Sequence, residues 1–268
     1  AAHGAALGMD TYVFIPSDLE EQKVLATGVY GTKLVKIKGN YDDVNRLCSE
    51  IAENEDWAFV NVNVRPYYAE GSKTLAFEIA EQLGWRLPTA VVAPMAGGSL
   101  VSKLRKGFGE FIDAGLVDGA APRLYGAQAS GCAPIVRLLE RGGETVVPEV
   151  PNTIARSIAI GNPADGALAA RSIRESGGWA AAVSDEELVA GIRLLAETTG
   201  IFAETAGGVT VAAALALARA GRLTSEDEVV LCITGNGLKT TDAVSQALPI
   251  APVIAPRLRE VAALIERH

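Results

Sequence analysis

Histidine is nearly absent from this chain of 268 residues, which has only His3 and His268, one near each end. Many zinc sites and all serine-type triads with a histidine base use imidazole groups in the folded interior, so the sequence argues against both and predicts no metal site. Cysteine is also scarce: Cys48, Cys132 and Cys232 each stand alone in an apolar stretch. Isolated thiols of this kind are typical of reduced core cysteines in a cytoplasmic protein.

The chain has no excess of basic residues. It carries 24 Lys and Arg against 32 Asp and Glu, a formal charge of −8, and a pI of about 5.0. This balance argues against a nucleic-acid partner. No apolar run approaches the roughly 20 residues of a membrane-spanning helix, so no membrane partner is expected either. With 49% apolar residues, the chain has enough side chains to bury for a folded α/β protein of one or two domains.

An initiator methionine is missing as well, because the chain starts at Ala1. Residues 1–8 have the pattern of the tail of a helix that ends at Gly8, without the basic start or cleavage site of a signal peptide. We therefore expect the chain to begin inside a longer protein. An initiator codon directly before Ala1 in the coding DNA would contradict this expectation.

Short apolar runs alternate with helical periodicity along the chain, which predicts open parallel sheets with helices on both faces. Residues 1–64 are expected to form a small β-α-β-α-β domain, and residues 65–268 a larger domain with a terminal helix. One long helix is predicted at about 69–83. The predicted strands are 11–15, 34–37, 57–62, 90–94, 124–127, 179–183 and 229–233.

Ligands of such sheets bind at the carboxyl ends of strands, so the loops there are the candidate sites. The loop 94–100, Pro-Met-Ala-Gly-Gly-Ser-Leu, joins an apolar strand to a helix. Small residues allow close backbone approach, and amides at the helix start favour an anion, so the loop predicts a phosphate cradle to which Ser99 adds a hydroxyl. A tight turn that needs glycine explains the same residues about equally well.

Two further loops carry polar groups after strands. Thr234 stands at the end of one strand, before Gly-Asn-Gly, where its hydroxyl can bond a ring heteroatom or merely end the strand. The stretch 61–74 contains Asn63 and Arg65, and a guanidinium there suits an anionic substrate, although a solvated surface position is the plainer interpretation.

At these loops the sequence closely resembles the threonine synthase family of fold type II pyridoxal-phosphate enzymes. The resemblance runs from the opening helix to about residue 245. It is carried by residues 65–78 (RPYYAEGSKTLAFE), 91–100 with Lys-Gly-Phe at 106–108, 160–163 (IGNP), 175–179 (ESGGW) and 234–239 (TGNGLK).

The resemblance implies two open parallel-sheet domains of three αβα layers, with the N-terminal part of the larger one missing, and pyridoxal 5'-phosphate as cofactor. It places Ala96, Gly97, Gly98, Ser99 and Leu100 at the cofactor phosphate. The family's commoner loop is Gly-Asn-Gly-Gly-Asn, so here the amides remain and Ser99 replaces the side-chain contact. Thr234 corresponds to the residue that bonds the pyridine nitrogen, and Asn63 and Arg65 correspond to groups for the substrate phosphate.

The family's reaction is a β,γ-replacement that converts O-phospho-L-homoserine and water to L-threonine and phosphate, usually in a homodimer. The family's Schiff-base lysine matches none of the eight lysines here. It is expected upstream of Ala1, so this chain by itself should be an inactive fragment.

Two other interpretations stay open. One is a different fold type II lyase, threonine dehydratase-like or cysteate synthase-like; the other is a non-catalytic relative that binds a ligand without the lysine. The coding sequence upstream of Ala1 would separate the enzymes from the non-catalytic relative.

Overall fold

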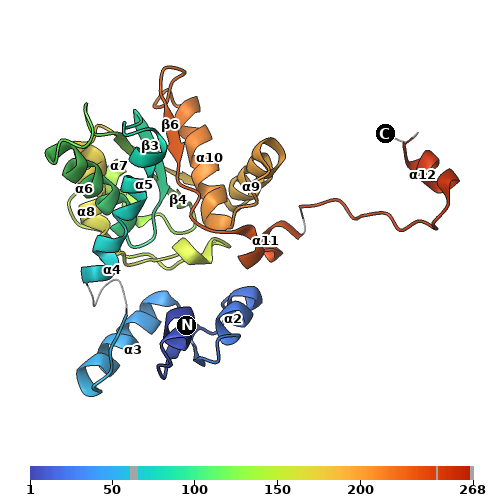
Figure 1. Ribbon diagram of the computed structural model, residues 1–268, viewed down its shortest axis with the longest axis horizontal. Helices are drawn as coiled ribbons and strands as arrows, with labels where there is room; N and C mark the ends of the chain where they lie inside the picture. The colour runs from blue at the N-terminus through green and yellow to red at the C-terminus, as the bar shows by residue number, and fades with distance from the viewer. Residues whose placement is uncertain (61–65, 246, 266–268) are drawn as a thin grey trace.

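The computed structural model of the protein describes residues 1–60, 66–245 and 247–265. Two separate sheets form, and every strand pair in both is parallel, as predicted (Figure 1). The smaller sheet pairs β1 (Tyr12–Pro16) with β2 (Lys33–Ile37). Its helices are α1 (Ala2–Ala6), α2 (Glu21–Gly28) and α3 (Tyr41–Asn54).

The predicted third strand of this part, 57–62, is not observed over residues 57–60, and residues 61 and 62 lie outside the described ranges. In this stretch the aromatic side chains stack, and no backbone ladder forms over residues 57–60. The Trp57 ring lies 4.8 Å from the Tyr12 ring of β1, and the Phe59 ring lies 6.4 Å from Trp57. Trp57 is 41% and Val60 85% exposed, so these two apolar side chains of the predicted strand do not enter the core.

The larger sheet has the strand order β5-β4-β3-β6. Its central strand β3 (Ala90–Pro94) is buried throughout, as its apolar sequence predicts for a parallel strand covered on both faces. The other strands are β4 (Arg123–Ala129), β5 (Ala180–Val183) and β6 (Val229–Leu231). All four predicted strands of this part are confirmed, with small differences at their ends.

Helices cover both faces of this sheet, which makes three layers (Figure 1). Val91 and Ala93 join the core beneath α5, α6, α7 and α8, whereas Ala90 and Val92 join the core beneath α9 and α10. The helix bounds are α5 Thr74–Gln82, α6 Ser99–Asp113, α7 Pro134–Arg141, α8 Gly166–Glu175, α9 Asp185–Thr199 and α10 Thr205–Arg219.

The helix predicted at 69–83 is two helices, α4 (Pro66–Gly71) and α5. Hydroxyl groups at the junction bond back to the backbone and compete with the helical ladder. The Thr74 hydroxyl donates to the Gly71 carbonyl oxygen at 2.9 Å, and the Ser72 hydroxyl to that of Tyr68 at 3.5 Å. The chain therefore turns between the two helices.

The remaining elements are short or peripheral: 3-10 turns η1 (Arg156–Ile158) and η2 (Gly237–Lys239), and helices α11 (Asp242–Ser245) and α12 (Leu258–Ile265). Residues 249–257 have no regular structure, and they carry α12 away from the rest of the molecule (Figure 1). No helix in the described ranges combines the length and apolar character needed to cross a bilayer. All three cysteines are buried and free, and burial raises the pKa of the Cys232 thiol to about 12.

Candidate cofactor site

A cleft of about 1220 Å³ lies between the two sheets. Loops at the carboxyl ends of β3 and β6 line it from the larger sheet, and the end of β1 with parts of α2 and α3 line it from the smaller one. All six predicted cofactor residues line this cleft: Ala96, Gly97, Gly98, Ser99, Leu100 and Thr234. Asn63 and Arg65, predicted for the substrate phosphate, lie outside the described residues.

The loop after β3 has a backbone shape that only glycine adopts easily. Gly98 has φ +94, in the left-handed region, and a Cβ there would lie 2.7 Å from the carbonyl oxygen of Asp165. A Cβ at Gly97 would meet nothing within 4 Å. The loop is thus closed on the protein side at Gly98 and open at Gly97, where a ligand can approach the backbone.

Ser99 begins the 15-residue helix α6 and is 9% exposed, yet its Oγ atom has no hydrogen-bond partner. A buried hydroxyl without a partner is costly, and it is explained when a ligand supplies the missing bond. The amides and partial positive charge of the helix start add to this preference for an anion. The residues present therefore fit the phosphate of pyridoxal phosphate.

Thr234 is exposed on the cleft after β6, and its turn is held in place by its neighbours. The Glu204 backbone N–H donates to the Gly235 carbonyl oxygen at 3.0 Å. The Glu204 carboxylate lies against Gly235 so closely that a Cβ at 235 would be 2.0 Å from Glu204 Oε1. The backbone of Gly235 is outside the left-handed region, so its conformation does not call for glycine. The lack of space beside the Glu204 carboxylate does.

Sequence reasoning missed Glu204, which is 7% exposed and lines the cleft. Its only sequence signal is a carboxylate directly before the small-residue helix α10, where it looks like an ordinary helix cap. In the structure it lies 3.9 Å from the Nζ atom of Lys23 on α2. A buried carboxylate thus meets a lysine from the other side of the cleft.

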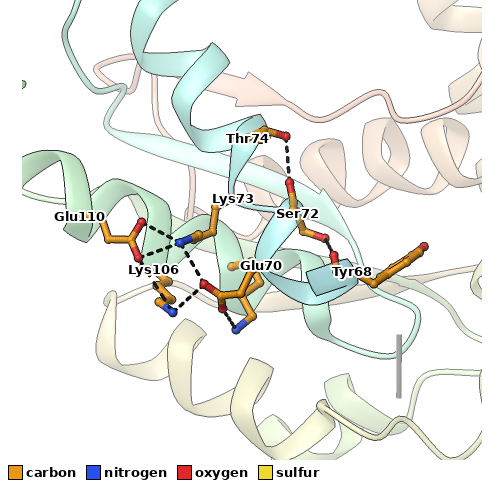
Figure 2. Close-up of polar contacts among 9 residues, drawn as sticks. Tyr68, Glu70, Ser72, Lys73, Thr74, Lys106 and Glu110 are labelled. Carbon is orange, nitrogen blue, oxygen red and sulfur yellow. Dashed lines mark hydrogen bonds and ion pairs between the residues drawn. The ribbon is translucent and has the colours of Figure 1, made fainter. Parts of the chain in front are cut away.

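Six of the eight lysines line the cleft or make ion pairs. Lys23 and Lys239 line the cleft. Lys33 pairs with Asp10 at 2.7 Å. Lys73, Lys103 and Lys106 are engaged by two carboxylates on α4 and α6 (Figure 2).

Two more contacts hold the smaller sheet's elements to the larger part. Arg156 of η1 pairs with Asp18 at 3.2 Å. Asp42, in the first turn of α3, faces the backbone of Gly161 and Asn162, which lowers its pKa, but its burial has the larger effect and raises the pKa. Both contacts border the cleft, because Asp18, Arg156 and Asn162 line it.

The sequence matches the family model described as "Pyridoxal-phosphate dependent enzyme" over residues 1–235. The chain belongs to this pyridoxal-phosphate-dependent family. Pyridoxal phosphate is therefore the cofactor that the cradle at 96–100 is suited to bind. Among the described residues, no group of three or more His, Cys, Asp or Glu side chains could hold a metal ion.

Relatives within this pyridoxal-phosphate family include named threonine synthases. That of Methanocaldococcus jannaschii is 36% identical over 249 residues, which cover 92% of this chain and 61% of that protein. That of Bacillus sp. strain ULM1 is 37% identical over 257 residues, or 94% of this chain and 70% of that protein. The chain thus spans about 60 to 70% of the length of these relatives.

Solved structures of the same fold include tomato threonine deaminase isoform 2, with a TM-score of 0.71 and 18% identity over 92% of this chain and 69% of that one. Maize serine racemase has the same TM-score and identity, over 99% of this chain and 74% of that one. At this identity the likeness shows the fold alone, and it confirms the fold type II architecture predicted from the sequence.

Proposed function

We propose that this chain is part of a threonine synthase, which converts O-phospho-L-homoserine and water to L-threonine and phosphate by β,γ-replacement. The observation that carries the proposal is the glycine cradle with the unpartnered Ser99 hydroxyl, which opens on a cleft between two parallel sheets. Relatives at 36 and 37% identity that are named threonine synthase support the choice of reaction.

In this proposal the backbone of 96–100 and the Ser99 hydroxyl hold the cofactor phosphate, while Thr234 bonds the pyridine nitrogen. A neutral hydroxyl at the nitrogen leaves the ring unprotonated. Pyridoxal phosphate supplies an electron sink for removal of the substrate's protons when it is bound. Asn63 and Arg65 receive the substrate phosphate, and the domain boundary lies near residue 64.

The proposal includes a lysine outside this chain. The two cleft lysines have other surroundings: Lys23 lies 3.3 Å from Glu20 and 3.9 Å from Glu204, and Lys239 ends the short turn η2. We place the Schiff-base lysine upstream of Ala1, so the 268 residues alone are expected to bind cofactor without turning over substrate. The active form is proposed to be a cytoplasmic homodimer.

The test compares this chain with the same chain extended by its upstream coding sequence, both supplied with pyridoxal phosphate and O-phospho-L-homoserine. We expect the extended protein to release phosphate and threonine in equal amounts, and the 268-residue chain to release neither. Formation of 2-oxobutanoate from threonine would favour a threonine dehydratase-like enzyme instead. Phosphate release by the short chain would refute the placement of the lysine, and no release by the extended one would refute the reaction.

A further inference from the structure

One carboxylate, that of Glu70 on α4, is surrounded by three lysines (Figure 2). Its Oε1 lies 2.7 Å from Lys103 Nζ, and its Oε2 lies 2.8 Å from Lys106 Nζ and 2.9 Å from Lys73 Nζ. These contacts hold the pKa of the Glu70 carboxyl far below its usual range. Glu70 is therefore ionised and paired at any physiological pH.

The same cluster includes Glu110, which binds Lys73 through both carboxylate oxygens at 2.9 Å (Figure 2). The side chains of Lys73 and Lys103 are only 17% exposed, which sets them apart from ordinary surface pairs. A network of several charges in fixed geometry is worth more than an isolated pair at the surface. We call these five residues, Glu70, Lys73, Lys103, Lys106 and Glu110, the α4–α6 latch.

Each of the two helices that the latch joins also lines the cleft. On α6, Lys103 and Lys106 follow Ser99 at spacings of four and seven residues, so they share a helix face with the residue that starts α6 and lines the cleft. On the α4 side, Tyr68 and Ser72 line the cleft and are themselves four residues apart. Glu70 lies two residues from both, so it projects from a different side of the turn.

Close packing supports the same junction. A Cβ at Gly107 of α6 would lie 2.8 Å from the Ala76 Cβ atom and 3.1 Å from the Lys73 carbonyl oxygen. The absent side chain lets α6 approach the start of α5, which brings Lys73 to Glu110. The segment that presents Tyr68 and Ser72 is therefore fixed on α6.

We propose that Glu70 is a positioning residue, which holds α4 on α6 so that the hydroxyl of Tyr68 meets the anionic head group of a phosphorylated amino-acid substrate. This inference rests on the proposed function and deepens it. A neutral hydroxyl donor adds a directional hydrogen bond to a phosphate without adding charge to the site. Because the latch fixes α4 on α6, the helix that begins at the cradle, the side chain that meets the substrate stays at a fixed distance from the cradle.

The experiment uses the 268-residue chain and its variants Glu70→Gln and Tyr68→Phe. The matched control is Glu50→Gln, which breaks the exposed pair with Arg46 on α3. Hydrogen exchange is measured for amides 68–73 and 99–105, together with the affinity for pyridoxal phosphate and for O-phospho-L-homoserine in the presence of saturating pyridoxal phosphate.

For Glu70→Gln we expect at least tenfold faster exchange over 68–73, unchanged exchange over 99–105, at least tenfold weaker binding of O-phospho-L-homoserine, and cofactor affinity within twofold. Tyr68→Phe should weaken O-phospho-L-homoserine several-fold with no change in exchange, which a purely structural role of the latch would not produce. Unchanged exchange in Glu70→Gln, or an equal loss of affinity for cofactor and substrate, would overturn the inference.

The proposed function fails separately. If the unaltered chain takes up pyridoxal phosphate but not O-phospho-L-homoserine, the assigned substrate is wrong. The positioning role of Glu70 is then tested by the exchange rates and by the binding of inorganic phosphate. If neither of them changes in Glu70→Gln, the inference is overturned.

Discussion

The backbone N–H of Asp165 donates a 2.9 Å hydrogen bond to the carbonyl oxygen of Gly97. Asp165 precedes α8 and Gly97 precedes α6, so this bond ties the starts of two helices together at the proposed phosphate cradle. Gly98 is confined between them, which is why a Cβ there would strike the Asp165 carbonyl group. The cradle is thus shaped by α8 as much as by its own glycines.

Replacement of Gly98 by alanine should weaken cofactor binding more than tenfold. The left-handed backbone costs an alanine roughly 1–2 kcal/mol, and the contact with Asp165 adds to this. Equilibrium dialysis with pyridoxal phosphate measures the effect. Gly109→Ala is the matched control, because Gly109 lies in the same helix and a Cβ there meets nothing within 4 Å. The cradle assignment is wrong if both variants bind the cofactor equally well.

Replacement of Ser99 by alanine should separate binding from stability. Its Oγ atom has no partner in the protein, so its loss should leave the cofactor-free melting temperature unchanged or slightly raised. Affinity for pyridoxal phosphate should fall about three- to tenfold, since one hydrogen bond contributes about 1 kcal/mol. Thermal melts with and without the cofactor measure both quantities.

The control for Ser99 is Ser102, whose buried hydroxyl donates to the Gly98 carbonyl oxygen at 2.9 Å. Ser102→Ala should lower the melting temperature of the cofactor-free chain, because it leaves that carbonyl oxygen without this donor. If Ser99→Ala were the more destabilising of the two without cofactor, the Ser99 hydroxyl would have a protein partner after all.

Replacement of Thr234 by valine should lower the turnover of the extended protein by roughly five- to 150-fold, as about 1–3 kcal/mol is lost with a buried hydrogen bond. The fold should be unaffected, because Thr234 is exposed in the cleft. Leu238→Ala on the same turn is the control, since Leu238 is 67% exposed and does not line the cleft. Steady-state phosphate release measures the effect. Equal rates for Thr234→Val and the unaltered protein would show that Thr234 does not belong to the site.

Acid should destabilise the chain through Asp227, which accepts bonds from the Thr224 backbone at 2.9 Å and the Thr89 hydroxyl at 3.1 Å and pairs with Arg123. These contacts lower its pKa to about 2. Because the folded-state pKa of Asp227 is lowered, its ionised carboxylate stabilises the folded chain at pH values above the unfolded-state pKa near 3.9. This stability is lost as the pH falls toward 2.

Urea unfolding between pH 5 and 2 tests this linkage, with Asp227→Asn as the variant and the exposed Asp118→Asn as its control. Asp227→Asn should be less stable than the unaltered chain at pH 5 and should lose less stability between pH 4 and 2. Parallel curves for all three proteins would show that Asp227 does not contribute.

The larger sheet was predictable from the sequence because its strands are short, apolar and buried on both faces, as 90–94 shows. The loop at 94–100 was predictable for a related reason, because its glycines follow such a strand directly, and its binding of a phosphate stays a prediction. The strand expected at 57–62 fails over 57–60 because aromatic side chains also stack without a ladder, and hydropathy does not distinguish the two cases. The long helix failed where hydroxyls bond back to the backbone.

Other parts of the site depend on contacts between distant segments, which local pattern does not contain. Glu204 reaches the cleft because α10 brings it to the turn after β6. Glu70 meets Lys103 and Lys106 across more than 30 residues of sequence. Each of these side chains resembles a solvated surface charge when only its neighbours in sequence are considered.

The contact between Glu204 and Gly235 links what these two positions can hold. With the Glu204 carboxylate where it lies, any side chain at 235 would overlap it, so a larger residue at 235 requires this carboxylate to move. A smaller residue at 204 lifts that restriction, because Gly235 has an ordinary backbone conformation that other residues adopt. We therefore expect positions 204 and 235 to covary, which an alignment of related sequences with no structure of their own can test.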